Sequence, residues 1–148
     1  MKTIKLGLIG VGGIGSLHLK HALMLADAQV TAVADTAKSA LDRAKEAGVK
    51  NTYTDYLELL KNPDVDAVVI ALPTHLHLKC ARDAAEAGKH IFLEKPIAIT
   101  VADAKEVIAS AQRSNVKLMM GYPMRFNRHF IKLKEDMANG FIGDVENA

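Results

Sequence analysis

The chain alternates between short apolar runs and longer stretches in which apolar residues recur at helical spacing. Val30–Ala34 and Asp66–Leu72 are short and almost wholly apolar, the pattern of parallel strands buried on both faces. This pattern predicts strands at Thr3–Ile9, Val30–Ala34, Asn51–Tyr53, Asp66–Leu72, His90–Leu93 and Lys117–Met120. Helices are predicted at Gly13–Ala26, Ala37–Ala47, Asp55–Lys61, His75–Ala87, Thr100–Arg113 and Arg128–Asn139.

The connections between these elements are short, and their residues are typical of helix ends. Thr54 and Thr100 are expected to cap helices, and Gly48 and Gly88 are placed to end helices in a left-handed conformation. Alternating strands and helices favour an α/β fold, a doubly wound parallel sheet of six strands with helices on both faces. We expect residues 1–148 to form one Rossmann-type domain.

Net charge, apolar runs and cysteine content limit the kinds of partner and compartment that we expect for this chain. The formal net charge is +2 and the basic residues are dispersed, so neither nucleic acid nor a membrane surface is expected as a partner. No apolar run is long enough to span a membrane. Cys80 is the only cysteine, which excludes an internal disulfide and fits a reducing compartment such as the cytoplasm. Its apolar helical setting favours a buried packing role.

The first predicted turn carries the motif G-x-G-x-x-G, formed by Gly10, Gly12 and Gly15, with Gly13 and Ile14 between the last two. Gly10 permits a tight exit from the strand, Gly12 lets a pyrophosphate approach the backbone, and Gly15 allows close packing of helix on strand. Free N–H groups at the helix start would face the phosphates.

Asp35 ends the next strand, twenty residues after Gly15, where its carboxylate would accept hydrogen bonds from ribose hydroxyls. The alternatives are a glycine-rich turn that binds nothing and a site for another nucleotide such as S-adenosylmethionine.

Further candidate residues follow other strands at the edge where ligands bind in open α/β sheets. They are Leu72, Pro73 and Thr74, then Glu94, Lys95 and Pro96, and finally Gly121 and Tyr122. Lys95 is the candidate catalytic residue, because its ammonium group would stabilise charge on a substrate oxygen; a solvated loop lysine is the alternative.

Three histidines lie on predicted helices near this edge. His77, in the first turn of a helix that begins there, would help to order the loop, with a surface position as the alternative. His18 and His21 have no third ligand nearby in sequence, so no metal site is predicted.

At these residues the sequence resembles the amino-terminal domain of the Gfo/Idh/MocA family, which includes glucose–fructose oxidoreductase and inositol dehydrogenase. The resemblance covers essentially the whole chain. It rests on Gly10–Gly15 with His18, Pro73-Thr74-x-x-His77, Ala87-Gly88-Lys89-His90 and Glu94-Lys95-Pro96, and on Gly121-Tyr122 with Arg125-Phe126 and the tail from Asn139 to Val145.

The resemblance implies NAD(P)-dependent oxidation of a hydroxyl on a sugar, cyclitol or related polyol. The glycine loop and Asp35 would hold the cofactor, with the Pro73-Thr74 turn along it and Glu94-Lys95-Pro96 beside the nicotinamide. Lys95 would contact the substrate hydroxyl. Asp35 favours NAD because a carboxylate repels a 2′-phosphate, while Lys38 leaves room for NADP.

Family members also carry a second domain that supplies the substrate pocket, a catalytic histidine and the usual oligomer interface. We expect that domain to lie outside this chain, so that catalysis and homo-oligomer formation need it. Apolar residues within Phe126–Phe141 are then expected to be exposed. The rival interpretation is a non-catalytic dinucleotide-binding sensor or regulatory module.

Overall fold

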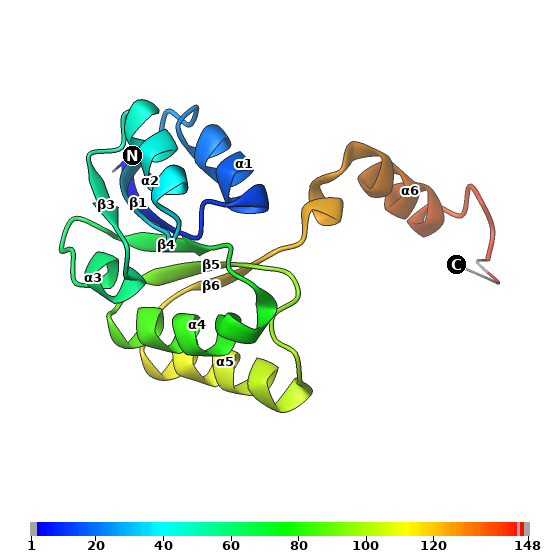
Figure 1. Ribbon diagram of the computed structural model, residues 1–148. Coiled ribbons are helices and arrows are strands. Elements are labelled where there is room, and N and C mark those ends of the chain that lie inside the picture. The colour runs from blue at the N-terminus through cyan, green and yellow to red at the C-terminus, as the bar shows by residue number, and fades with distance from the viewer. Residues whose placement is uncertain (1–2, 145, 147–148) are drawn as a thin grey trace.

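The computed structural model describes residues 3–144 and 146, and the fold is a six-stranded, wholly parallel sheet with helices on both faces (Figure 1). The predicted fold class is confirmed. The strands are β1 (Ile4–Ile9), β2 (Ala28–Ala34), β3 (Asn51–Tyr53), β4 (Ala67–Ile70), β5 (His90–Glu94) and β6 (Leu118–Gly121). The α-helices are α1 (Gly13–Ala22), α2 (Lys38–Glu46), α3 (Tyr56–Leu60), α4 (His77–Glu86), α5 (Val101–Arg113) and α6 (Arg128–Ala138). Two 3₁₀ turns, η1 (Thr74–Leu76) and η2 (Pro123–Phe126), precede α4 and α6.

The strands lie in the order β3-β2-β1-β4-β5-β6, so the winding direction reverses between β1 and β4. Helices α1 and α2 pack on one face, where Leu8 and Val33 are fully buried. Helices α3, α4 and α5 cover the other face over Val68, Ile70 and Leu93. Because both faces are covered, β4 is wholly apolar and β1 carries no polar side chain from Leu6 to Ile9. The reversal leaves a crevice beyond the carboxyl ends of β1 and β4.

The predicted boundaries of several helices differ from the structure. Helix α4 begins at His77 rather than His75, because the chain first forms the 3₁₀ turn η1. Helix α1 ends at Ala22, not Ala26, because the chain must turn to start β2 at Ala28, which lies opposite Ile4 in the sheet. Helix α3 begins at Tyr56, and its cap is Asp55 rather than Thr54: the Asp55 carboxylate accepts the Leu57 N–H at 2.9 Å. Other caps are as predicted, with Thr100 accepting the Asp103 N–H and Gly48 and Gly88 at positive φ.

Helix α6 projects away from the sheet and packs against η2 (Figure 1). None of its residues is buried, and its apolar residues Phe130, Leu133 and Met137 are each more than 40% exposed. The expected exposure of this segment is therefore observed, while Val145 of the tail motif lies outside the described residues. Within the described part of the chain, no helix is long and apolar enough to cross a membrane.

Candidate functional site

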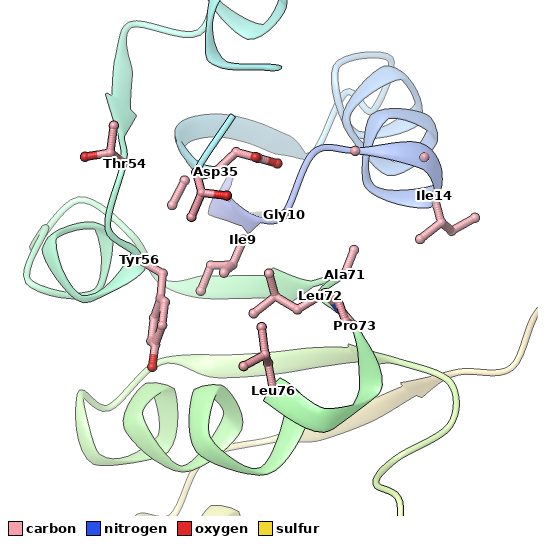
Figure 2. Close-up of a pocket in the computed structure, with 14 residues that line it drawn as sticks. Ile9, Gly10, Ile14, Asp35, Thr54, Tyr56, Ala71, Leu72, Pro73 and Leu76 are labelled. Atoms are coloured by element: carbon pink, nitrogen blue, oxygen red, sulfur yellow. The ribbon is translucent and has the colours of Figure 1, made fainter. Parts of the chain in front are cut away.

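A cavity of about 480 Å³ lies at the reversal of strand order, and the predicted glycine loop forms one side of it (Figure 2). The opposite side comes from the segment after β4, which contributes Leu72, Pro73 and Leu76. The full lining comprises Ile9, Gly10, Gly12, Gly13, Ile14, Ala34, Asp35, Thr36, Thr54, Tyr56, Ala71, Leu72, Pro73 and Leu76. Segments far apart in sequence thus meet where an open α/β sheet binds its ligand.

The glycines of the loop differ in what surrounds them. Gly10 has φ +84°, and a Cβ there would lie 2.7 Å from the Ala71 carbonyl oxygen. A Cβ on Gly15 would lie only 2.0 Å from the Gly10 oxygen, so this glycine sets the close packing of helix on loop. Gly12 and Gly13 face open space, with no atom within 4 Å of an added Cβ. The loop therefore presents bare backbone toward the cavity.

Helix α1 starts at this loop. Its N-cap is Gly12, which has no side chain to bond the first N–H groups. The first turn contains no acidic residue, so the positive end of the helix dipole stays available to an anion. Bare backbone together with a free helix start suits a pyrophosphate.

Asp35 is fixed by the backbone at the carboxyl end of β2. Its Oδ2 accepts the Val11 N–H at 2.7 Å and its Oδ1 accepts the Ala37 N–H at 2.8 Å. A carboxylate accepts about four hydrogen bonds in all, so lone pairs remain for a ligand's hydroxyl groups. Asp35 is half-buried and lines the cavity (Figure 2), as the ribose assignment requires.

The far wall contains Tyr56, which sequence reasoning missed (Figure 2). Its hydroxyl donates to Asp83 Oδ2 at 2.6 Å and accepts from Lys79 Nζ at 2.9 Å, and Lys79 also pairs with Asp83. Burial, followed by the bond to Asp83, raises the pKa of the Tyr56 hydroxyl. The network locks the ring against the cavity, at the end where Thr36 and Thr54 also lie. Its members are far apart in sequence and match no motif.

Glu94 lines a second, smaller hollow of about 130 Å³ between β5 and η2, together with His18 and Tyr122. Glu94 is 7% exposed, and its Oε1 lies 2.7 Å from His18 Nε2. Its Oε2 accepts the Lys95 backbone N–H at 3.0 Å. Both carboxylate oxygens are thus engaged within the protein. Phe92 meets the His18 ring edge-on at 5.4 Å between centroids.

Lys95 is exposed, and its loop continues into Pro96, whose carbonyl oxygen lies 2.8 Å from His77 Nδ1. His77 Nε2 lies 2.8 Å from the Leu72 carbonyl oxygen, and the residue is only 1% exposed. His77 therefore sits behind the cavity wall. His75, on the neighbouring 3₁₀ turn η1, is exposed.

The profile of the oxidoreductase family with an NAD-binding Rossmann fold, Gfo/Idh/MocA, matches residues 4–122. The chain belongs to this family. Myo-inositol 2-dehydrogenase of Thermotoga maritima is 38% identical over 141 residues, which is 95% of this chain but 42% of that protein. The structure of scyllo-inositol dehydrogenase from Lactobacillus casei with bound NAD(H) and scyllo-inositol matches with a TM-score of 0.91 and 34% identity, over 97% of this chain and 43% of that one.

An α-N-acetylgalactosaminidase of Shewanella oneidensis is also similar, at 32% identity over 98% of this chain and 34% of that protein. The chain thus spans less than half the length of these members of the Gfo/Idh/MocA family. The region shared by all of them contains the glycine loop and Asp35. Because the names of these relatives imply different reactions, this region by itself does not specify the reaction.

Only some of the site residues predicted from the sequence line the main cavity. Gly10, Gly12, Gly13, Ile14, Asp35, Leu72 and Pro73 line the main cavity. Gly15 lies beneath the loop and acts through packing. Thr74, His77, Glu94, Lys95 and Pro96 lie outside the lining, so direct contact of these residues with the cofactor stays a prediction. The single crevice expected from the strand ends is divided into two hollows.

Proposed function

We propose that this chain is the cofactor-binding part of an NAD-dependent dehydrogenase that oxidises a hydroxyl of a cyclic polyol. The observation that carries the proposal is the cavity at the strand-order reversal, where bare glycine backbone lies beside a fixed carboxylate, Asp35. The names of the inositol dehydrogenases among the relatives support the substrate class.

Each part of the cofactor would be bound by a different part of the cavity. Gly12 and Gly13 would receive the pyrophosphate, Asp35 the adenosine ribose hydroxyls, and the wall at Tyr56 the adenine. When bound, NAD would supply the acceptor for a hydride from the carbon that carries the hydroxyl. Lys95 would orient the substrate oxygen and stabilise negative charge that develops on it. The group that takes the proton, and the pocket for the rest of the polyol, would come from a second domain.

Two contacts favour NAD over NADP. The Asp35 carboxylate is held where a 2′-phosphate would have to approach, and like charges at close range repel. Lys38 was the candidate partner for such a phosphate, but its ammonium already bonds Asp42 Oδ2 at 2.8 Å. We therefore expect tighter binding of NAD. A cytoplasmic location would suit both this cofactor and the free thiol of Cys80.

The test uses the intact protein that contains this chain. We expect reduction of NAD with myo- or scyllo-inositol, and a thermal midpoint that rises with NAD; a ligand at a hundred times its Kd stabilises the folded state by about 2.7 kcal/mol. Lys95→Met should lower kcat by about 10²–10³-fold and leave NAD binding intact. Lys105→Met, an exposed lysine on α5, is the matched control.

Binding of NAD without turnover of any polyol or sugar would favour the sensor instead. The absence of NAD binding in folded protein would refute the proposal.

A further inference from the structure

The His77 side chain is almost completely buried and uses both ring nitrogens. Nδ1 lies 2.8 Å from the Pro96 carbonyl oxygen and Nε2 lies 2.8 Å from the Leu72 carbonyl oxygen. A carbonyl oxygen can only accept a hydrogen bond, whereas a neutral imidazole carries a single N–H. Whichever ring nitrogen carries that N–H, the imidazole bridges the two carbonyl groups across its width.

The two carbonyls belong to the two segments that build the site. Leu72 lines the cofactor cavity directly after β4, and Pro96 follows the candidate catalytic residue Lys95. The Leu72 segment is anchored independently, because the neighbouring Ala71 N–H donates to the Ile9 oxygen at 2.9 Å. Lys95 and Pro96 are exposed, and the Lys95 N–H is bonded to Glu94 Oε2 at 3.0 Å. The histidine adds a second fixed point, at the Pro96 carbonyl directly after Lys95.

The charged side chains near His77 already have hydrogen-bond or ion-pair partners other than His77. On the Lys95 side, Glu94 bonds His18 and the Lys95 N–H. On α4 itself, Lys79 pairs with Asp83, and Cys80 is a buried thiol. On α5, which packs against α4, Glu106 bonds Arg113 and Ser110. Among the described residues, the two carbonyls are the hydrogen-bond partners of the His77 ring.

We infer that His77 is a positioning residue whose ring bridges the Leu72 and Pro96 carbonyls and so fixes Lys95 relative to the cofactor. This inference rests on the proposed dehydrogenase function. His77 would act through Lys95 without touching the cofactor. A displacement of about 1 Å at a reacting group can lower the rate by about 10²-fold, so loss of the tie is expected to reduce kcat more than cofactor affinity.

The kinetic test compares His77→Gln, Lys95→Met and the double variant in the intact protein, with inositol and NAD as substrates. A glutamine amide cannot span both carbonyls. We expect His77→Gln to lower kcat by about 10- to 100-fold and to change the KM for NAD by less than about threefold. In the Lys95→Met background, His77→Gln should have no further effect, because coupled residues are not additive. Additive losses would overturn the inference. His75→Gln, on the exposed η1 turn, should behave as wild type.

A second measurement needs no variant. Nitrogen-15 NMR of the histidine rings in the wild-type protein should show a His77 ring N–H that exchanges slowly with solvent, as a buried hydrogen bond to a backbone carbonyl requires, whereas the exposed His75 ring should exchange fast. A His77 ring N–H that exchanges as fast as that of His75 would overturn the inference even if His77→Gln failed to fold. Wild-type protein that binds NAD but oxidises no polyol would refute the proposed function, while the NMR result would still decide whether His77 makes the bridge.

Discussion

Replacement of Gly15 by alanine offers the sharpest test of how the phosphate loop is built. Gly15 lies in the first turn of α1, and an added Cβ would lie 2.0 Å from the Gly10 oxygen and 2.8 Å from its carbonyl carbon. Cβ atoms essentially never approach another heavy atom closer than 3.0 Å, so helix and loop must separate by about 1 Å. Both contacted atoms belong to backbone, which cannot rotate away as a side chain would.

The expected loss of stability has two parts. Overpacking of this kind costs roughly 1–3 kcal/mol. Alanine gains up to about 1 kcal/mol over glycine through its helix propensity, which offsets part of that cost. A net loss of about 1–2 kcal/mol should lower the melting temperature of a protein of this size by roughly 2–8 °C. The displaced loop should also lose NAD binding, because Gly10 and the helix start would no longer face the pyrophosphate together.

The controls are Gly12→Ala and Gly13→Ala in the same loop. Neither added Cβ has an atom within 4 Å. Gly13 lies in the first turn of α1, and Gly13→Ala, the control for stability, should melt within about 1 °C of wild type or slightly above it. Gly12 lines the cavity, so Gly12→Ala is the control for binding and should lose NAD binding without the backbone clash of Gly15→Ala. Thermal melts with and without NAD separate these cases. A Gly15→Ala protein with wild-type melting and NAD binding would refute the reasoning.

Two buried side chains give further predictions. Burial is the main reason that the pKa of the Cys80 thiol is raised to about 12. We therefore expect almost no reaction of Cys80 with a disulfide reagent at pH 8 until the protein is denatured. Rapid labelling of the native protein would contradict this prediction. Lys89→Met removes the donor to the Asn62 and Val65 carbonyls and should cost about 1–3 kcal/mol in urea unfolding at pH 7. Burial lowers the pKa of the Lys89 ammonium in the folded state. Because the unfolded chain then binds more protons at Lys89, the free energy of unfolding of the wild type should increase relative to that of Lys89→Met as the pH rises toward 10.5.

The pattern of the sequence was sufficient for features that depend on local chemistry. Buried parallel strands must be apolar on both faces, which placed β2 and β4 within a few residues. Gly48 and Gly88 occupy left-handed positions that other residues rarely adopt, so they marked the ends of α2 and α4. Gly10 and Gly15 of the glycine loop were predictable for the same reason, because a side chain at either position would clash with backbone.

Features that depend on distant contacts were not predictable. Tyr56 forms a cavity wall only because Asp83, 27 residues away in sequence, and Lys79 hold its hydroxyl. The end of α1 follows from where β2 must begin to pair with Ile4, a constraint set by the sheet rather than by the helix. The division of the crevice into two hollows likewise depends on residues around Phe92 and Tyr122, which are brought together by β5 and η2.

Glu94 shows how a motif can be located correctly and still leave its role open. As a charged residue at the end of an apolar strand, it suggested a group aimed at the ligand. In the structure its two oxygens bond His18, 76 residues earlier, and the N–H of Lys95. Glu94 is also only 7% exposed, so its carboxylate offers little open surface to a substrate, unlike the half-buried Asp35. Glu94 is therefore better suited to hold the backbone of Lys95, and the exposed lysine is left as the group in this segment that is free to meet a substrate.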